Sequence, residues 1–242
     1  LMIIIIIYLL YRQYRLRSQQ KLSLLQKQIS ETKQEYLRKQ MNPHFLFNTL
    51  NSIQYFMFNN DKISTNDYMS KFAMLIRKSL ENSEKDYTSI KDEIETLELY
   101  LELEKLRFKN KFTYQIIIDP EIDVIQQKIP SMIIHPFVEN AIIHGLHYLE
   151  KDGELMIKLD QNNHIMTCIV EDNGIGRKKA EEIRIWKNSN HHSMGTSITN
   201  ERLKILDKES GNVLNITFID LFDQDNKPSG TRVIINLPSY NN

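Results

Sequence analysis

The first half of the chain alternates apolar and polar positions at helical spacing. The positions that recur at intervals of three or four residues are Leu22, Leu25, Ile29, Thr32 and Tyr36. This heptad pattern predicts a parallel dimeric coiled coil. Further helices are predicted at about residues 66–80 and 90–108, and glycine is absent before Gly145. We therefore expect residues 18–110 to form a coiled coil and a dimeric helical hairpin.

Beyond residue 110 the pattern changes to short strands mixed with helices. Strands are predicted at 112–118, 154–159, 165–170, 213–222 and 231–237, and helices at 130–145, 178–186 and 197–206. Elements in this order predict an α/β sandwich with helices on one face of a sheet. The expected fold class is α+β, with residues 111–242 as a second domain.

The first ten residues are almost wholly aliphatic and are followed by two tyrosines and three arginines up to Arg17. A spanning helix needs roughly 20 apolar residues, so we interpret residues 1–17 as the end of a transmembrane helix and its flank. A buried strand or a start-site artefact is the alternative. The basic residues follow the apolar run, which disfavours a signal peptide. The expected location is the cell membrane, with residues from about 12 onward cytoplasmic.

Charge and cysteine content exclude some classes of function. The 31 basic and 31 acidic residues cancel, so no overall charge indicates direct nucleic-acid binding. Cys168 is the single cysteine, and it cannot form an intrachain disulfide. A reducing compartment is expected.

His44 is the first candidate for chemistry. At helical pitch it shares a polar stripe with Asn48, opposite the apolar side chains that can fill a bundle core. Pro43 removes a backbone donor and should kink the helix beside the imidazole. An imidazole is a competent nucleophile at neutral pH. A solvated surface histidine is the alternative.

The second candidate site is rich in glycine. Asp172 follows the strand predicted at 165–170 and precedes Gly174 and Gly176, so its carboxylate can accept the amino group of adenine above a tight turn. Upstream, residues 135–145 predict a glycine-capped helix that carries Asn140. The amide oxygen of Asn140 could hold Mg²⁺, or could merely satisfy buried backbone.

Two sequence motifs resemble those of a known family. Residues 42–48, with sequence NPHFLFN, resemble the phosphoacceptor motif of LytS/YehU-type sensor histidine kinases. Residues 100–108, with sequence YLELEKLRF, resemble the family's Tyr-Leu…Arg-Phe helix. The resemblance covers nearly everything from residue 38 to residue 238.

The glycine-rich segments resemble, in order, the boxes of a GHKL-type ATP-binding domain. The resemblance implies that Asn140 chelates Mg²⁺ and that Asp172 reads adenine, aided by Thr231. It also implies that Gly174, Gly176 and Gly195 flank a flexible lid at about residues 177–194. His144 would partly replace a lysine that the family often carries at the position of Ile143.

The implied activity is autophosphorylation of His44 by ATP, with Asn48 orienting the ring. The phosphoryl group would pass to an aspartate of a response regulator, of the LytTR type by resemblance, and the chain would act as a homodimer. The alternative is a degenerate GHKL module that serves as a nucleotide-binding or dimerisation scaffold. Ile143 and Ser197, which depart from the family's boxes, favour it. Pro136 disfavours a chaperone-like ATPase, which needs a carboxylate there.

Overall fold

The computed structural model describes residues 12–13, 15, 49, 51–54, 58, 62–83, 85–149, 152–162, 165–186 and 215–238. Residues 1–46 and 47–242 form separate compact units, and the description below concerns the second. The predicted coiled coil, the helix at 197–206, His44, Asn48 and Gly195 lie outside the described residues. Among the helices that are described, none is both long and apolar enough to cross a membrane.

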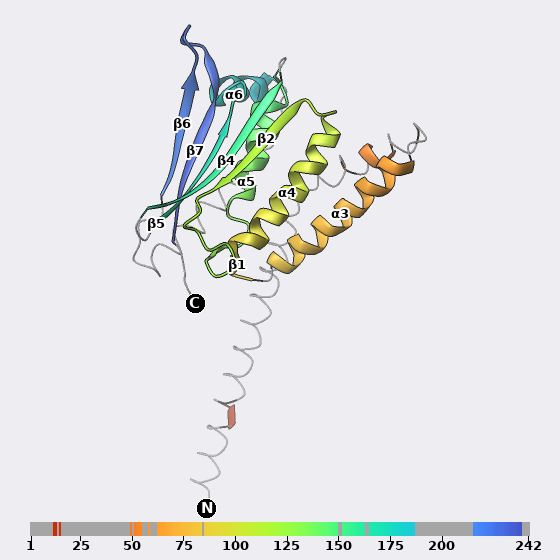
Figure 1. The fold of residues 1–242 in the computed structure, drawn as a ribbon, viewed down its shortest axis with the longest axis vertical. Helices are drawn as coiled ribbons and strands as arrows, with labels where there is room; N and C mark the ends of the chain where they lie inside the picture. Colours follow the sequence, from red (N-terminus) through yellow and green to blue (C-terminus); the bar gives the residue numbers. More distant parts are fainter. Residues whose placement is uncertain are drawn as a thin grey trace, which may run out of the picture. The chain divides into compact units, whose positions relative to one another are not determined.

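Within the described residues, five strands form one mixed sheet (Figure 1). In spatial order they are β2 (Phe112–Ile118), β4 (Gly153–Asn162), β5 (Ile165–Asp172), β7 (Pro228–Pro238) and β6 (Ile216–Phe222). β2 pairs with β4 in parallel, whereas the other neighbours are antiparallel. The strands predicted at 112–118, 154–159, 165–170, 213–222 and 231–237 are thus confirmed, with small differences at their ends.

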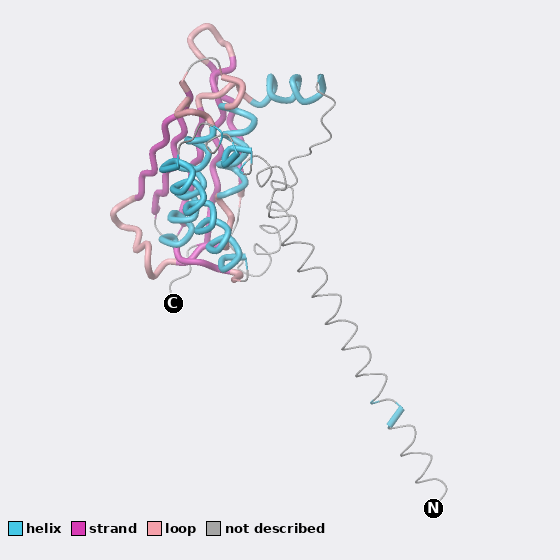
Figure 2. The backbone as a smooth tube through the Cα atoms, turned by 90° about the vertical axis from the view of Figure 1, so that its right-hand side faces the viewer, coloured by secondary structure: helices cyan, strands magenta, loops and turns pink. Residues whose placement is uncertain are grey.

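Helices cover one face of this sheet, as expected. They are α4 (Ile90–Arg107), α5 (His135–Asn140), the π-helix η1 (Ala141–Leu146) and α6 (Arg177–Trp186), seen beside the strands in Figure 2. Alternate residues of the central strands are buried under them, namely Leu155, Ile157, Leu159, Met166, Cys168, Val170, Val233, Ile235 and Leu237. This two-residue periodicity is what a sheet with one covered face requires. The α+β fold class is confirmed.

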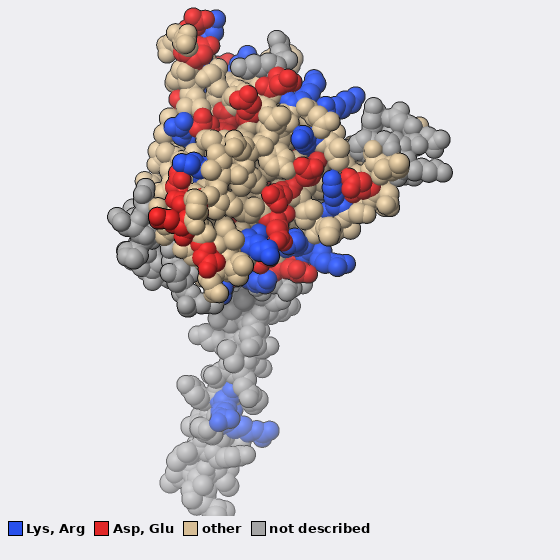
Figure 3. Space-filling view, in the orientation of Figure 1, with Lys and Arg blue, Asp and Glu red and all other residues tan. Residues whose placement is uncertain are grey.

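The uncovered side chains of the strands are mixed in character. Arg232 of β7 pairs with Glu171 of β5, and Lys158 lies 2.7 Å from Asp160 within β4. The space-filling view shows acidic and basic side chains close to one another rather than separated by sign (Figure 3). Paired charges of this kind keep a half-exposed sheet face soluble.

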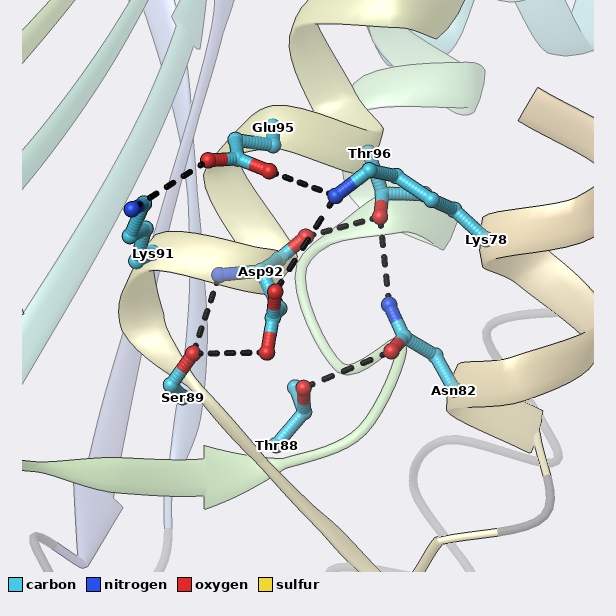
Figure 4. Close-up of polar contacts among 8 residues, drawn as sticks. All are labelled: Lys78, Asn82, Thr88, Ser89, Lys91, Asp92, Glu95 and Thr96. Atoms are coloured by element: carbon cyan, nitrogen blue, oxygen red, sulfur yellow. Dashed lines mark hydrogen bonds and ion pairs between the residues drawn. The ribbon is translucent and has the colours of Figure 1, made fainter. Parts of the chain in front are cut away.

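Helices α3 (Lys62–Ser83) and α4 are tied together by buried polar groups (Figure 4). Asn82 Nδ2 donates to the Thr96 hydroxyl at 3.1 Å, and the Thr88 hydroxyl donates to Asn82 Oδ1 at 3.4 Å. All three side chains are buried. Because buried polar groups need partners, these bonds fix the relative position of the two helices.

α4 begins where the sequence suggests, because Ser89 caps it. The Ser89 hydroxyl accepts a hydrogen bond from the Asp92 amide at 3.1 Å. The short strand β1 (Tyr87–Ser89) before it pairs with β3 (Lys128–Pro130). α4 itself packs against both α3 and β2, which lies beyond residue 110. The division of the chain near residue 110 stays a prediction.

The helical region predicted at 130–145 starts later than that range, at the first residue of the predicted glycine-capped helix 135–145, and ends one residue later. Pro130 belongs to β3, and Met132 adopts a left-handed backbone with φ of 58°, so the helix starts only at His135. Gly145 does not end the helix either, since η1 continues to Leu146. Gly145 therefore lies inside the helical segment and does not cap it.

Candidate functional site

Asp172 lies at the centre of the candidate site. It is the last residue of β5, paired on one side with Leu155 and on the other with Thr231, and it is only 5% exposed. Its Oδ1 accepts a hydrogen bond from the Gly174 amide at 2.9 Å. Burial raises the pKa of Asp172 to about 6, while backbone hydrogen bonds from Gly174 and Thr231 oppose the rise. The carboxylate is thus held ready to accept a further donor.

Three glycines pack directly around Asp172, two of them against its carboxylate and one against its backbone carbonyl. A Cβ on Gly145 would lie 2.6 Å from Asp172 Oδ1, and a Cβ on Gly174 would lie 2.4 Å from the Gly145 carbonyl carbon. Gly230 has φ of 144°, and a Cβ there would lie 1.9 Å from the Asp172 carbonyl oxygen. Carbon atoms normally pack at about 3.5–4.0 Å. Any side chain at these positions would therefore displace Asp172 or its loop.

The loop after Asp172 is fixed to its neighbours by backbone hydrogen bonds. The Ile175 amide donates to the Gly145 carbonyl at 3.2 Å, which ties the loop to η1. The Glu154 amide donates to Asn173 Oδ1 at 2.8 Å, and the Asn173 amide returns a bond to the Glu154 carbonyl at 3.2 Å. The turn then passes into α6. The predicted lid at 177–194 begins as this helix, and its remaining residues, 187–194, lie outside the described part.

A buried carboxylate from α4 positions the helix opposite Asp172. Glu93 is 1% exposed, and its two oxygens accept the Met132 and Ile134 amides at 2.9 and 3.2 Å. These amides stand at the start of α5, where an anion also complements the helix dipole. α5 then leads to Asn140, at which the α-helix changes to the π-helix η1. Single π-turns within helices are frequently found at functional sites.

The Tyr-Leu…Arg-Phe segment of α4 packs against this same helix start. The Tyr100 ring lies 4.5 Å from the His135 ring, centroid to centroid, and Arg107 pairs with buried Glu104. The Arg107 guanidinium also lies 4.4 Å from the centre of the Phe108 ring. Tyr100 of this motif therefore has a structural role, which is to pack α4 against the start of α5, whereas Arg107 pairs within α4.

A cavity of about 230 Å³ opens between α5, η1, α6 and the sheet. The residues predicted for the site that line it are Asn140, His144, Asp172, Gly176 and Thr231. Gly174 lies beside it, bonded to Asp172. The structure thus brings together six residues from three separate segments of the chain. Their assigned roles stay predictions.

Other lining residues were not identified from the sequence. Phe137 and Phe218 supply aromatic walls, and Arg177 lies at the start of α6. Val170 and Val233 supply an apolar floor from adjacent strands. Phe218 could have been found only through its register with Val233, because nothing in its local sequence marks it.

The residues present fit a nucleotide with a magnesium ion. A buried carboxylate and a hydroxyl beside apolar side chains suit a base that carries an amino group. Asn140 offers one oxygen ligand, and the described residues contain no group of three or more acidic, histidine or cysteine side chains that could hold a metal. Mg²⁺ is usually bound through few protein ligands together with substrate phosphates and water. The donor set agrees with that pattern.

Comparisons with known proteins point to one family. Residues 32–112 match the family model described as histidine kinase. The sensor histidine kinase BtsS of Escherichia coli K12 is 33% identical over 145 residues, which are 60% of this chain and 25% of BtsS. The sensor histidine kinase YesM of Bacillus subtilis is 27% identical over 213 residues, 88% of this chain and 34% of YesM.

The sensor protein LytS of Enterococcus faecalis is 28% identical over 177 residues, 73% of this chain and 30% of LytS. Among solved structures, the catalytic domain of histidine kinase ThkA gives a TM-score of 0.41 at 16% identity, over 64% of this chain and 97% of that one. The chain spans between a quarter and about a third of the length of the three sequence relatives. It is related to the LytS-type sensor histidine kinases, and the resemblance drawn from its motifs is confirmed.

Proposed function

We propose that this chain is the catalytic part of a two-component sensor histidine kinase that uses ATP to phosphorylate itself on His44. The observation that carries the proposal is the cavity framed by Asp172, Asn140 and Thr231, where three glycines leave no room for other side chains around Asp172. Such close backbone packing has a cost in folding, because glycine is the most flexible residue in the unfolded chain. A role in binding a nucleotide explains why glycines stand at these positions despite their cost to folding.

In the proposed complex, Asp172 accepts the amino group of adenine and Thr231 contributes its hydroxyl. Asn140 holds a magnesium ion, which neutralises charge on the nucleotide phosphates. Val170 and Val233 provide the apolar surface beneath the base. Since phosphoryl transfer depends mainly on positioning and charge neutralisation, the residues of the cavity need only hold the donor in place.

The acceptor is His44, on the strength of its motif in the sequence. Its unprotonated ring nitrogen attacks the γ-phosphorus and a nitrogen–phosphorus bond forms, while the bond from γ-phosphorus to the bridging oxygen breaks and ADP leaves with the electron pair. The proton on the other ring nitrogen then passes to solvent water, which leaves neutral phosphohistidine. Asn48 orients the imidazole. The phosphoryl group then passes to an aspartate of a response regulator, for which we propose the LytTR type.

The setting of this activity is part of the proposal. Residues 1–17 would be the end of a membrane-spanning helix, and residues 18–110 would form a coiled coil and a dimeric helical bundle that presents His44. The cell membrane would then be the location, with residues from about 12 onward in the cytoplasm. A shift or twist of the helices would carry the signal.

The decisive experiment is label transfer from γ-labelled ATP to the purified chain and to His44→Gln. Acid-labile, base-stable label on the wild type alone is the expected result. Asp172→Asn should reduce the label by weakening nucleotide binding, while leaving His44 in place. Label on His44→Gln would contradict the assignment of the acceptor.

A scaffold without kinase activity is the second candidate. Ile143 supports it, because η1 carries no lysine where the family often places one near the phosphates. The same experiment separates the two functions. Binding of ATP to wild type without any transferred label would favour the scaffold over the kinase.

A further inference from the structure

One wall of the cavity is formed by Arg177 and Phe218, which lie outside the NPHFLFN and YLELEKLRF motifs. Arg177 donates from Nε to Asp220 Oδ1 at 2.7 Å and from Nη2 to Oδ2 at 2.9 Å. Its guanidinium lies 5.2 Å from the centroid of the Phe218 ring, which in turn lies 6.2 Å from the centroid of Phe137. The two-point ion pair fixes the plane of the guanidinium against the aromatic ring.

The register of the sheet places this wall across the cavity from Asp172. Asp172 pairs with Thr231, and Thr231 pairs with Asp220, so the three residues form one row across β5, β7 and β6. In the next row of the same face, Val233 pairs with Phe218. Two strand spacings separate Asp172 from Asp220, which is roughly 10 Å. A planar ring system bound to Asp172 therefore extends over Val233 toward Phe218 and Arg177.

The charge of Arg177 is already balanced by Asp220. This pairing raises the pKa of Arg177 and lowers that of Asp220, mainly through the side-chain hydrogen bonds. A guanidinium neutralised in this way offers a flat, polarisable surface more than a net positive charge. It suits contact with a base better than contact with a phosphate group.

We propose that Arg177 and Phe218, with Asp220 holding the guanidinium in place, form the specificity-determining wall of the base subsite, against which the far end of adenine packs. The inference rests on the proposed nucleotide-binding function and names the surface that selects the base. Aromatic and guanidinium groups both interact favourably with π-systems. The roughly 10 Å between Asp172 and Asp220, set by two strand spacings, leaves room for a two-ring base, which would reach the wall more fully than a single ring.

The test is calorimetric titration of the full chain with Mg²⁺ and ATP, CTP or inorganic tripolyphosphate. Arg177→Met and Phe218→Leu should each raise the Kd for ATP about threefold to tenfold. The preference for ATP over CTP should shrink in both variants, and the Kd for tripolyphosphate should stay unchanged. Both positions are partly exposed, and thermal unfolding of each variant confirms that it is folded.

Arg232→Met is the matched control. Arg232 lies on the same strand as Thr231 and pairs with Glu171, and its side chain is 40% exposed compared with 48% for Arg177. It points to the opposite face of the sheet, so its loss should leave the Kd for ATP unchanged.

Three outcomes would overturn the inference in different ways. An unchanged Kd for ATP in both variants would remove the wall from the base subsite. An equal loss of affinity for ATP and tripolyphosphate would place Arg177 on the phosphates instead. Wild-type protein that binds no ATP at all would contradict the proposed function itself, and the wall with it.

Discussion

Gly145 and Asp172 approach each other so closely that a Cβ on Gly145 would lie 2.6 Å from Asp172 Oδ1. The glycine belongs to η1 and the carboxylate ends β5, so the helical layer and the sheet meet at this contact. The absence of a side chain on the helix is what lets the carboxylate stand at the cavity floor while it accepts the Gly174 amide.

The first prediction follows from that contact. In Gly145→Ala the new methyl group displaces the Asp172 carboxylate, so we expect the Kd for ATP to rise by at least about tenfold, equivalent to 1.4 kcal/mol. Isothermal titration measures the affinity, and circular dichroism checks that the helices are retained.

Gly153→Ala is the control for this change. A Cβ on Gly153 would meet Leu146 Cδ2 at 3.0 Å and Phe112 Cβ at 3.1 Å, and neither contact touches Asp172. This variant should lose some stability and keep its affinity for ATP. Equal affinities of the two glycine variants would show that the contact with Asp172 has no bearing on binding.

The second prediction concerns pH. The pKa of Asp172 is raised to about 6, mainly by burial, and the ionised carboxylate is the form that accepts an amino group. ATP affinity should therefore be highest above pH 7 and fall as the pH drops through 6, by up to about tenfold per unit well below the pKa. Asp172→Asn should bind more weakly and lose this dependence between pH 5 and 8, measured by titration at constant ionic strength. A wild-type affinity that stays constant over that range would contradict the role of Asp172.

The strands of the sheet could be predicted from the sequence because the residue types within each strand are themselves typical of strands. Short runs rich in β-branched and other apolar residues, such as 112–118 and 165–170, are bounded by polar residues, which indicates strands. The glycines near Asp172 were also visible, since seven glycines in 242 residues make a local group noticeable. Local patterns therefore sufficed for the layers and for most of the site.

What the sequence could not provide depends on contacts between distant segments. The helix begins at His135 rather than 130 because Glu93 holds the Met132 amide across 39 residues of sequence. The wall of Arg177 and Phe218 depends on the register of β6 against β7. Gly145 looked like a helix cap because its contact with Asp172 appears only after folding. No local pattern carries this information.

The third prediction tests how Glu93 holds the start of α5. Glu93→Gln replaces one acceptor oxygen with a donor, so one of the Met132 and Ile134 amides loses its partner in a buried place. The free energy of unfolding should fall by about 1–3 kcal/mol, measured by urea denaturation. Glu98→Gln, at an exposed position on the same helix, should change it by less than about 0.5 kcal/mol. Equal losses in the two variants would rule out a special role for Glu93.

The fourth prediction concerns Glu104, a carboxylate only 1% exposed on α4. Burial raises its pKa from 4.5 to about 7; pairing with Arg107 opposes the rise, and the charge of Glu139 adds to it. A carboxyl group whose pKa is higher in the folded state favours folding while it is protonated. Its contribution is therefore complete below pH 4.5 and is lost as the pH rises through 7.

Glu104→Gln tests this, because glutamine has nearly the same shape and does not titrate. Relative to the variant, the wild type should become less stable from pH 5 to pH 8, by about 3 kcal/mol for a shift of this size. Urea denaturation at several pH values measures the difference, and Glu98→Gln should follow the wild-type profile. Parallel profiles for wild type and Glu104→Gln would mean that Glu104 stays ionised in the folded chain, so that Arg107 compensates its burial completely.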